Sequence, residues 1–316
     1  MFIHASAEYL PQRVVDNEYF SALTGRPVEW FQKLTGIRQR RRAGEGENAG
    51  TMAIAAVENL LRKSPQALAG VDLIVAASYT PWDTIGTIAH VVQRRFQISN
   101  ARAMYLSTAC SSFIDSLELV AAYFESGRAH KALMIAVEHN SLYSSDSDDK
   151  SGHLWGDGAA AVLLGKAPAG QAMEIVDVKA VGRADLGRGP EAIVMEPHGA
   201  GLAMHHGKDI FSHACREMAT ASLDILQRND VLFSEVSLLV PHQANQRIID
   251  CLVEHLQFPA SRVAITIGEL GNTGCASVAI TYHRYWEQIA PGKFAVLVTF
   301  GGGYSAGAAL VKRHER

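Results

Sequence analysis

The stretch GDGAAAVLL at residues 156–164 leads from glycines into an apolar strand-like segment, and the apolar run ALMIAV at 132–137 precedes it. The same order recurs near the end of the chain, as FAVLVT at 294–299, GGG at 301–303 and AALV at 308–311. Internal duplication is the economical explanation of such a repeat. The sequence therefore predicts a protein built from two similar halves.

Helix-like and strand-like stretches alternate outward from this repeat, which is typical of layered α/β proteins rather than of sandwiches or bundles. In the first half we predict helices at 51–63, 87–96 and 111–126 and strands at 72–77, 103–106, 131–137 and 159–164. In the second half we predict helices at 209–227, at 244–256 and beginning near 275, and strands at 174–180, 236–240, 263–267, 294–299 and 306–311. The halves are expected to span residues 1–168 and 169–316.

The bulk composition is that of an ordinary globular protein, with 316 residues, 48% hydrophobic residues and a formal charge of −3. The mild acidity argues against nucleic acid or an anionic membrane as a partner. No apolar run approaches the ~18 residues of a membrane span, and residues 1–10 lack a cationic region followed by an apolar one. We therefore expect a cytoplasmic protein with no membrane partner.

The four cysteines, Cys110, Cys215, Cys251 and Cys275, are too few and too scattered to suggest a disulfide framework. No CxxC pair offers a zinc site. Cys251 and His255 have helical i,i+4 spacing, but no second pair is evident. We therefore expect a buried cysteine and a surface histidine on one helix, and no metal.

Cys110 lies in YLSTACSSF at 105–113, where an apolar strand-like run ends and an amphipathic helix begins. Unpaired N–H groups and the macrodipole at a helix N-terminus stabilise a thiolate, which would lower the cysteine pKa. His242 precedes the predicted helix at 244–256, and Asn272 lies in a Gly-Asn-Thr-Gly segment before another helix. Each alone has an ordinary structural interpretation, as a packed cysteine, a satisfied histidine or a turn. Together, near the carboxyl ends of predicted strands, they indicate an active site.

Several short motifs carry a resemblance to a known family. They are TACSS at 108–112, PHQAN at 241–245, GNT at 271–273, FGGG at 300–303, Trp30 with TGIR at 35–38, and GDG at 156–158. With these motifs the whole chain resembles the β-ketoacyl-acyl carrier protein synthase III family. The resemblance implies a thiolase-like, five-layered αβαβα fold of two duplicated halves, usually homodimeric. The half 1–168 would carry the nucleophilic cysteine, and the half 169–316 the histidine and asparagine.

The resemblance also implies the reaction, a decarboxylative Claisen condensation in fatty-acid initiation or in a specialised lipid or polyketide pathway. Cys110 would take an acyl group from acyl-CoA or an acyl carrier protein, and the N–H groups of Cys110 and Gly302 would form the oxyanion hole. His242 and Asn272 would then stabilise the enolate formed when a malonyl thioester loses CO₂. No cofactor is expected, because the coenzyme A or phosphopantetheine thioesters are substrates.

The substrate side departs from the common family pattern. Residues that the resemblance places at the substrate are Trp30, Arg38, Trp155, Asn245 and Arg247. Leu34 stands where relatives commonly have an arginine against adenine, with Lys150 a partial replacement for a second one, and the basic patch for the carrier is thinned at Ser212, Glu254 and His255. Cys275 is expected to be a small-residue replacement at a helix start. The run Arg38–Arg42 is expected to be either solvated surface or a binding site for the phosphates of coenzyme A or its carrier.

Two alternatives remain open at this point. An acyltransferase of the same fold could move the acyl group to another acceptor without decarboxylation. A non-catalytic subunit could pair with an active homologue and shape its tunnel. The retained cysteine, histidine and asparagine argue against both.

Overall fold

Nine strands form one mixed sheet in the computed structural model, which describes residues 1–170, 173–196, 198–199 and 201–315. The first half contributes β1 (Phe2–Tyr9), β4 (Leu73–Ala77), β5 (Arg102–Leu106), β6 (Lys131–Glu138) and β7 (Gly158–Gly165). The second half contributes β8 (Met173–Gly182), β11 (Val236–Pro241), β12 (Phe294–Gly301) and β13 (Ser305–Lys312). The strand order is β11-β12-β13-β8-β1-β7-β6-β4-β5.

The two halves repeat one topology. In the first, β4 runs parallel to β5 and β6, and β7 runs antiparallel to β6 and β1. In the second, β11 runs parallel to β12 and makes a parallel bridge from Leu239 to Val263, while β13 runs antiparallel to β12 and β8. The halves meet where Phe2 and Ile3 pair with Glu174 and Met173. The predicted duplication is therefore confirmed at the level of strand pairing.

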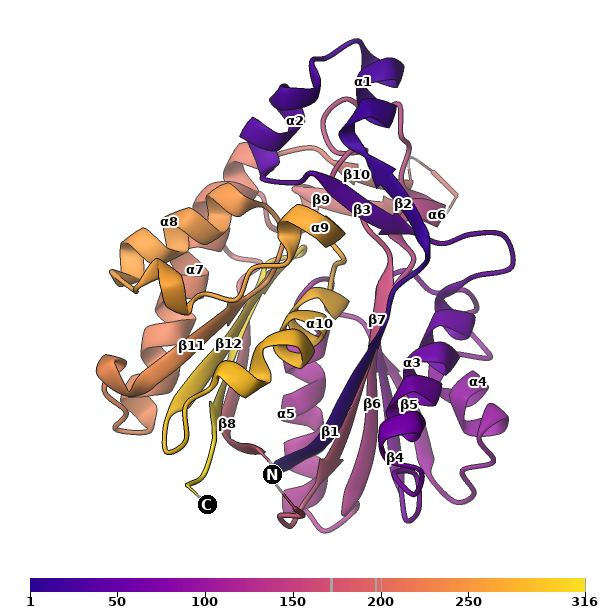
Figure 1. Cartoon of the computed structure of the whole chain (residues 1–316), viewed down its shortest axis with the longest axis vertical. Helices are drawn as coiled ribbons and strands as arrows, with labels where there is room; N and C mark the ends of the chain where they lie inside the picture. The colour runs from indigo at the N-terminus through magenta and orange to yellow at the C-terminus, as the bar shows by residue number, and fades with distance from the viewer. Residues whose placement is uncertain (171–172, 197, 200, 316) are drawn as a thin grey trace.

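The strands of the two halves lie on opposite sides of a central layer of helices, so the sheet supplies two layers. Helices supply the other three of the five layers, as Figure 1 shows. The middle layer is α5 (Ser112–Glu125) with α10 (Ala276–Tyr285), and the outer layers are α3 (Ala49–Lys63) with α4 (Ile88–Arg95) and α7 (Gly207–Arg228) with α8 (Gln246–Leu256). Helix α5 contacts β4 and β6 on one side and β8 and β13 on the other. A helix covered on both sides needs apolar residues around much of its surface, and α5 buries Phe113, Ile114, Leu117 and Val120. No helix in the described ranges is long and apolar enough to cross a membrane.

The predicted elements agree closely with the structure, but several others were not predicted. They are β1, β2 (Arg13–Asp16), α1 (Asn17–Thr24), α2 (Val28–Thr35), β3 (Gln39–Arg42), α6 (Asn140–Tyr143), β9 (Ile193–Glu196), β10 (Gly201–Met204) and α9 (Ile267–Leu270). The predicted strand at 263–267 is only a bridge at Val263, followed by α9. The segments from β2 to β3 and the β9–β10 hairpin lie above the top of the sheet in Figure 1, where they cover the active-site end of the fold.

The structure corrects both expectations for the run Arg38–Arg42, because Arg40 and Arg42 are buried and bonded within the fold. Arg40 is 0% exposed, and its guanidinium donates to Asn17 Oδ1 at 3.0 and 3.1 Å and to the carbonyl of Val15 at 3.2 Å. Arg42 is also buried and pairs with Asp146. Burial lowers the pKa of Arg40 to about 9, with Arg42 contributing, so these hydrogen bonds hold a cation that is costly to bury. The arginines tie β3 to its neighbours rather than binding phosphate.

We expect Arg40→Ala to lower the free energy of unfolding by ~3 kcal/mol, because it leaves Asn17 and backbone carbonyls buried without a donor. Urea denaturation measures the change. The matched control is Arg38→Ala, which removes the same side chain from an exposed position and is expected to change stability by less than ~0.5 kcal/mol. Equal effects of the two substitutions would contradict the structural role of Arg40.

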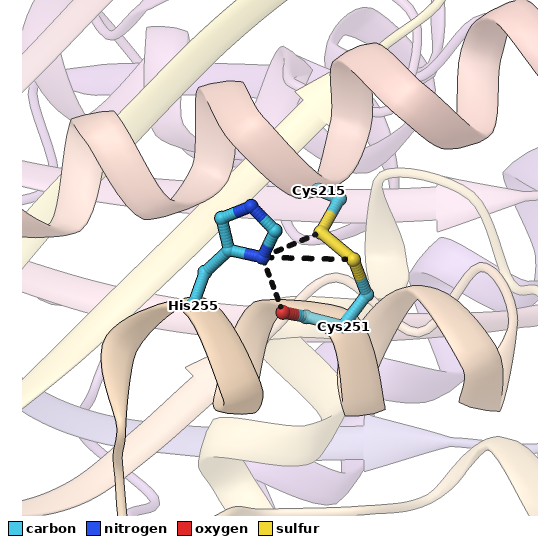
Figure 2. A group of neighbouring side chains, drawn as sticks. All are labelled: Cys215, Cys251 and His255. Atoms are coloured by element: carbon cyan, nitrogen blue, oxygen red, sulfur yellow. Dashed lines mark hydrogen bonds between the residues drawn. A yellow bond between two sulfur atoms is a disulfide. The ribbon is translucent and has the colours of Figure 1, made fainter.

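A second correction concerns the cysteines, since a disulfide joins Cys215 on α7 to Cys251 on α8 (Figure 2). The pairing spans 36 residues and depends on two helices packing side by side. His255 lies against both sulfurs. The expected pair of Cys251 and His255 on one helix is therefore part of a group of three. The cysteines, all within the described ranges, form no framework of several bridges, but the single bridge between Cys215 and Cys251 was not predicted.

Candidate active site

Cys110 lies in the turn from β5 into α5, with its side chain 8% exposed. The preceding residue, Ala109, has a φ of 52°, a left-handed conformation that is costly for a residue with a Cβ. The Ser112 hydroxyl stabilises this turn, because it donates to the Ala109 carbonyl at 2.6 Å and accepts from the Thr108 N–H at 2.8 Å. The strained turn places the sulfur at the wall of a cavity.

The acidity of this thiol differs from the sequence-based expectation. Burial raises the pKa of Cys110 to about 12, and the Glu138 carboxylate adds to the rise. The N–H groups of Gly302 and of Cys110 itself, together with the Tyr79 hydroxyl, act in the opposite direction. The expectation of a lowered pKa was therefore wrong, because desolvation outweighs the helix N-terminus. At neutral pH the thiol is protonated, so its proton must leave during acylation.

The predicted oxyanion hole depends on a close approach of two backbone segments. A Cβ on Gly301 would lie 2.8 Å from the Ser111 nitrogen and 2.9 Å from the Cys110 nitrogen. Only glycine permits this contact. It brings the following N–H, that of Gly302, to the Cys110 sulfur beside the N–H of Cys110. The two donors named from the resemblance therefore face the same atom.

His242 follows β11 and is almost fully buried. Its side-chain Nδ1 lies 2.7 Å from the Ser277 hydroxyl, and its backbone N–H donates to the Val298 carbonyl at 2.8 Å. Burial lowers the pKa of His242 to about 4, so the imidazole is neutral at pH 7. A neutral imidazole has one N–H and one acceptor nitrogen, and Ser277 can complement Nδ1 in either tautomer. Nε2 can therefore either accept or donate a proton.

Asn272 lies in the turn before α10, where Gly271 and Gly274 have φ values of 65° and 55°. Its side-chain Oδ1 accepts from the Gly274 N–H at 2.9 Å, and its backbone N–H donates to the Leu154 carbonyl at 2.8 Å. Because Oδ1 is occupied, the side-chain NH₂ is the group available to a ligand. Asn272 lines the same cavity as Cys110 and His242. The site thus offers a thiol, an imidazole and a neutral amide donor.

The cavity has a volume of about 740 Å³ and mostly apolar walls. It brings together residues from both halves and from α2, α7 and the start of α8. Lining residues that we predicted are Trp30, Cys110, Trp155, His242, Asn245, Arg247, Asn272 and Gly302. Leu34 lines it as well and adds an apolar side chain from α2.

Arg38 is the predicted binding residue that the structure does not bring to this cavity. It lines a separate groove with Gly36 and Gln246, and its guanidinium lies 3.9 Å from the Glu269 carboxylate. Arg38 precedes β3, and its backbone N–H donates to the Gly268 carbonyl at 2.9 Å, which places its side chain beside α9 and away from the cavity. The expectation that Arg38 binds substrate is therefore not supported.

Four residues behind the cysteine were missed or undervalued by the sequence reasoning. The Tyr79 hydroxyl lies beside the Cys110 sulfur and donates to Asn140 Oδ1 at 2.7 Å. Glu138 is fully buried, which raises its pKa to about 7, and its carboxylate accepts from the Tyr79 N–H at 3.2 Å. Cys275 precedes α10, buried in the core, with its sulfur 3.3 Å from the Ala77 carbonyl, in keeping with a small packed residue. The fourth residue is Ser277, the partner of His242 Nδ1. None of the four has a local sequence signal.

A cysteine at the start of a central helix, with a histidine and an asparagine from the other half of a duplicated fold, defines a thiolase-type condensing enzyme, an acyltransferase. The profile described as 3-Oxoacyl-[acyl-carrier-protein (ACP)] synthase III matches residues 104–182, and that of its C-terminal part matches residues 226–313. The chain belongs to the 3-oxoacyl-[acyl-carrier-protein] synthase III family.

Similar proteins cover nearly the whole chain. A β-ketoacyl-[acyl-carrier-protein] synthase III of Roseiflexus castenholzii is 33% identical over 96% of this chain and 95% of its own. The solved structure of the synthase III of Thermus thermophilus is 33% identical, covers 99% of both chains and has a TM-score of 0.91. A priming β-ketosynthase from the R1128 polyketide pathway is 28% identical, covers 99% and 96%, and has a TM-score of 0.89.

Proposed function

We propose that this enzyme joins an acyl group held on Cys110 to a malonyl-type thioester, releasing CO₂ and giving a 3-oxoacyl product. The observation that carries the proposal is the convergence of Cys110, His242 and Asn272 on one cavity with the Gly302 N–H. The named relatives make 3-oxoacyl-acyl carrier protein, and one structural neighbour primes a polyketide pathway. Fatty-acid initiation and a specialised pathway use the same chemistry.

In the first half-reaction the Cys110 sulfur attacks the carbonyl of an acyl-CoA or acyl carrier thioester. His242 Nε2 receives the thiol proton while its Nδ1–H donates to Ser277, and it returns the proton to the departing thiol. The N–H groups of Cys110 and Gly302 stabilise the tetrahedral oxyanion. The products are an acyl-cysteine and a free coenzyme A or carrier thiol.

In the second half-reaction the malonyl thioester loses CO₂ and its carbonyl oxygen becomes an enolate oxygen. Between the two half-reactions the neutral imidazole changes tautomer, losing its Nδ1 proton and gaining one at Nε2 by exchange with water in the cavity. His242 Nε2–H and the Asn272 NH₂ then donate to the enolate oxygen, and Ser277 donates to Nδ1. The enolate carbon attacks the acyl-cysteine, and Cys110 leaves as a thiolate that takes up a proton. Both donors are neutral, so they stabilise the negative charge without first having to ionise.

The charged part of the cavity lining suits a thioester carrier with phosphates. Arg26, Lys150, Lys208 and Arg247 contribute to it, and Asp149, the acidic residue among the described lining, pairs with Arg26 at 3.3 Å. Arg26 lies over the Trp30 ring at 4.4 Å, a platform for a planar group. We propose that coenzyme A or phosphopantetheine thioesters bind here as substrates, and that the enzyme needs no cofactor.

We also propose a homodimer and a cytoplasmic location. β5 is an edge strand of the sheet, and the loop after β4 exposes Trp82 (59%) and Ile85 (89%) beside it. A second copy would cover this edge, and sedimentation equilibrium tests it. A cytoplasmic location fits because coenzyme A thioesters and a reduced Cys110 belong to reducing compartments.

The test of the proposed function is release of ¹⁴CO₂ from carboxyl-labelled malonyl carrier with and without an acyl donor. We expect release coupled to formation of a 3-oxoacyl carrier. Acylation of Cys110 without CO₂ release would favour a non-decarboxylating acyltransferase, and no acylation at all would favour a non-catalytic subunit.

We expect Ser277→Ala to lower kcat for condensation at least ~10-fold with little change in KM, because the buried imidazole loses its Nδ1 partner. Steady-state kinetics across pH 5–9 measures this. Ser277→Thr keeps the hydroxyl and is expected to restore most of the rate. An alanine variant with the wild-type kcat and pH profile would contradict the positioning role.

A further inference from the structure

The disulfide between α7 and α8 lies in an asymmetric environment (Figure 2). Cys215 is 2% exposed, Cys251 is half-buried, and His255 is exposed. The Nδ1 atom of His255 lies 3.5 Å from the Cys215 sulfur, 3.7 Å from the Cys251 sulfur and 3.0 Å from the Cys251 carbonyl oxygen. Cys251 is therefore the more accessible of the two cysteines, and an imidazole lies within reach of both sulfurs.

We propose that Cys215, Cys251 and His255 form a reversible dithiol–disulfide site that controls how firmly α7 and α8 hold the wall of the acyl cavity. Disulfides in reducing compartments are usually transient, catalytic or redox-sensing rather than structural. A partly exposed disulfide is also the kind that thiols reduce most readily. The proposed substrates place this enzyme in such a compartment, so a permanent crosslink is not expected there.

The exchange takes two electrons from a dithiol. A thiolate of the reductant attacks the Cys251 sulfur, the S–S bond breaks, and the bonding pair leaves on the Cys215 sulfur. His255 Nδ1–H, held by the Cys251 carbonyl, can give a proton to that thiolate while the exposed ring takes up a proton from water at Nε2. The second thiolate of the reductant then displaces the Cys251 sulfur, which also takes up a proton. The protein gains two thiols and the reductant becomes a disulfide.

The two helices that the disulfide joins also form one wall of the cavity. On α7, Phe211, Ala214 and Met218 line it, and Ala214 is the direct neighbour of Cys215. On α8, Ile248 lines it one turn before Cys251. Opening the disulfide leaves α7 and α8 held by side-chain packing, including Arg247 over the Phe211 ring at 5.9 Å. We therefore expect the reduced enzyme to accept bulkier acyl groups than the oxidised one.

The first experiment equilibrates the full-length protein in buffers of reduced and oxidised dithiothreitol and of glutathione. The protein is quenched in acid, denatured and alkylated with N-ethylmaleimide, and peptide mass spectrometry counts the thiols at Cys215 and Cys251, with Cys110 and Cys275 as internal references. We expect the pair to titrate as one two-electron unit within the range of glutathione buffers. A disulfide that stays closed in excess reduced dithiothreitol, or thiols that never pair under oxidised buffer, would overturn the proposal.

His255→Phe separates the role of the imidazole from that of the sulfurs, since it keeps a ring in place and removes the nitrogens. We expect reduction by dithiothreitol at pH 7 to slow ~10-fold with little change in the equilibrium ratio. An unchanged rate would remove His255 from the site. One equivalent of Zn²⁺ bound by the reduced protein, with loss of reoxidation, would show a metal site and also overturn the redox assignment.

The effect on the cavity is measured as the ratio of acylation rates for a bulky and a short acyl-CoA. We expect reduction to raise this ratio several-fold, and the Cys215→Ser, Cys251→Ser double variant to show the reduced ratio at every redox setting. A double variant whose ratio of acylation rates matches that of the oxidised wild type would contradict the coupling between the disulfide and the cavity. This readout rests on the proposed function, whereas the thiol titration does not. Failure of the function would appear as no acyl adduct in either redox state.

Discussion

Incubation of the Cys110→Ala variant with acyl-CoA and acyl-carrier donors is expected to give no acyl-enzyme, whereas the wild type gains the mass of one acyl group. Cys110 is the cysteine that lines the cavity among the described residues, and Cys275 is buried in the core behind it. Loss of the nucleophile is expected to lower turnover at least ~10³-fold. Intact-protein mass spectrometry with donors from acetyl to long and aromatic chains measures both the adduct and the preferred chain.

The matched control is Cys275→Ala, which removes a thiol from the neighbouring core without touching the cavity. It is expected to keep the adduct. An acyl group that persists on the Cys110→Ala variant, or disappears from Cys275→Ala in a folded protein, would contradict the assignment of the nucleophile. The wild-type acylation rate is expected to stay nearly constant across the neutral range, because there His242 is already neutral and the Cys110 thiol is still protonated, so the proton moves between them during the step.

The second large effect is expected from Asn272→Ala, which should leave acylation of Cys110 nearly unchanged and slow CO₂ release ~10²- to 10³-fold. The NH₂ group of Asn272 is one of two neutral donors proposed for the enolate oxygen, and acylation uses different donors, the N–H groups of Cys110 and Gly302. Single-turnover measurement of the acyl-enzyme, followed by ¹⁴CO₂ release on adding malonyl carrier, separates the two steps.

Asn272→Asp is the informative companion variant. Its carboxylate keeps the shape of the side chain and the acceptor for the Gly274 N–H, but it replaces the donor with a negative charge. We expect it to slow decarboxylation at least as much as alanine does, with the turn preserved. Condensation at the wild-type rate in either variant would mean that the enolate oxygen binds elsewhere.

Much of the fold could be predicted because its elements are regular and apolar. The strands β7 and β12 are buried along their whole length and β6 and β13 along all but their ends, so each appears in the sequence as a largely apolar run. The elements between residues 1 and 42 were missed because they are short and partly exposed. Strand β1 alternates more weakly, and its register depends on β7, which lies far away in the sequence.

The active site, too, could be predicted only in part from the sequence. Cys110 and His242 were found because each stands at a strand end before a helix, Asn272 because it stands in a glycine turn before α10, and all three because they belong to family motifs. Ser277 and Tyr79 were missed because their roles arise from contacts between elements distant in sequence. Burial also reversed two sequence-based expectations. It raised the pKa of Cys110, and it turned the arginines of β3 from surface charges into buried hydrogen-bond donors.

The middle layer of helices has a consequence for how the molecule holds together. Helix α5 belongs to the first half but lies on β8 and β13 of the second, and α10 belongs to the second half but lies on β1 and β7 of the first. Each half therefore supplies part of the other's core. A fragment ending at residue 168 would expose apolar faces that the second half covers in the whole protein. We therefore expect the two halves to unfold together and not one after the other, and an active site made from both to be lost in that same transition.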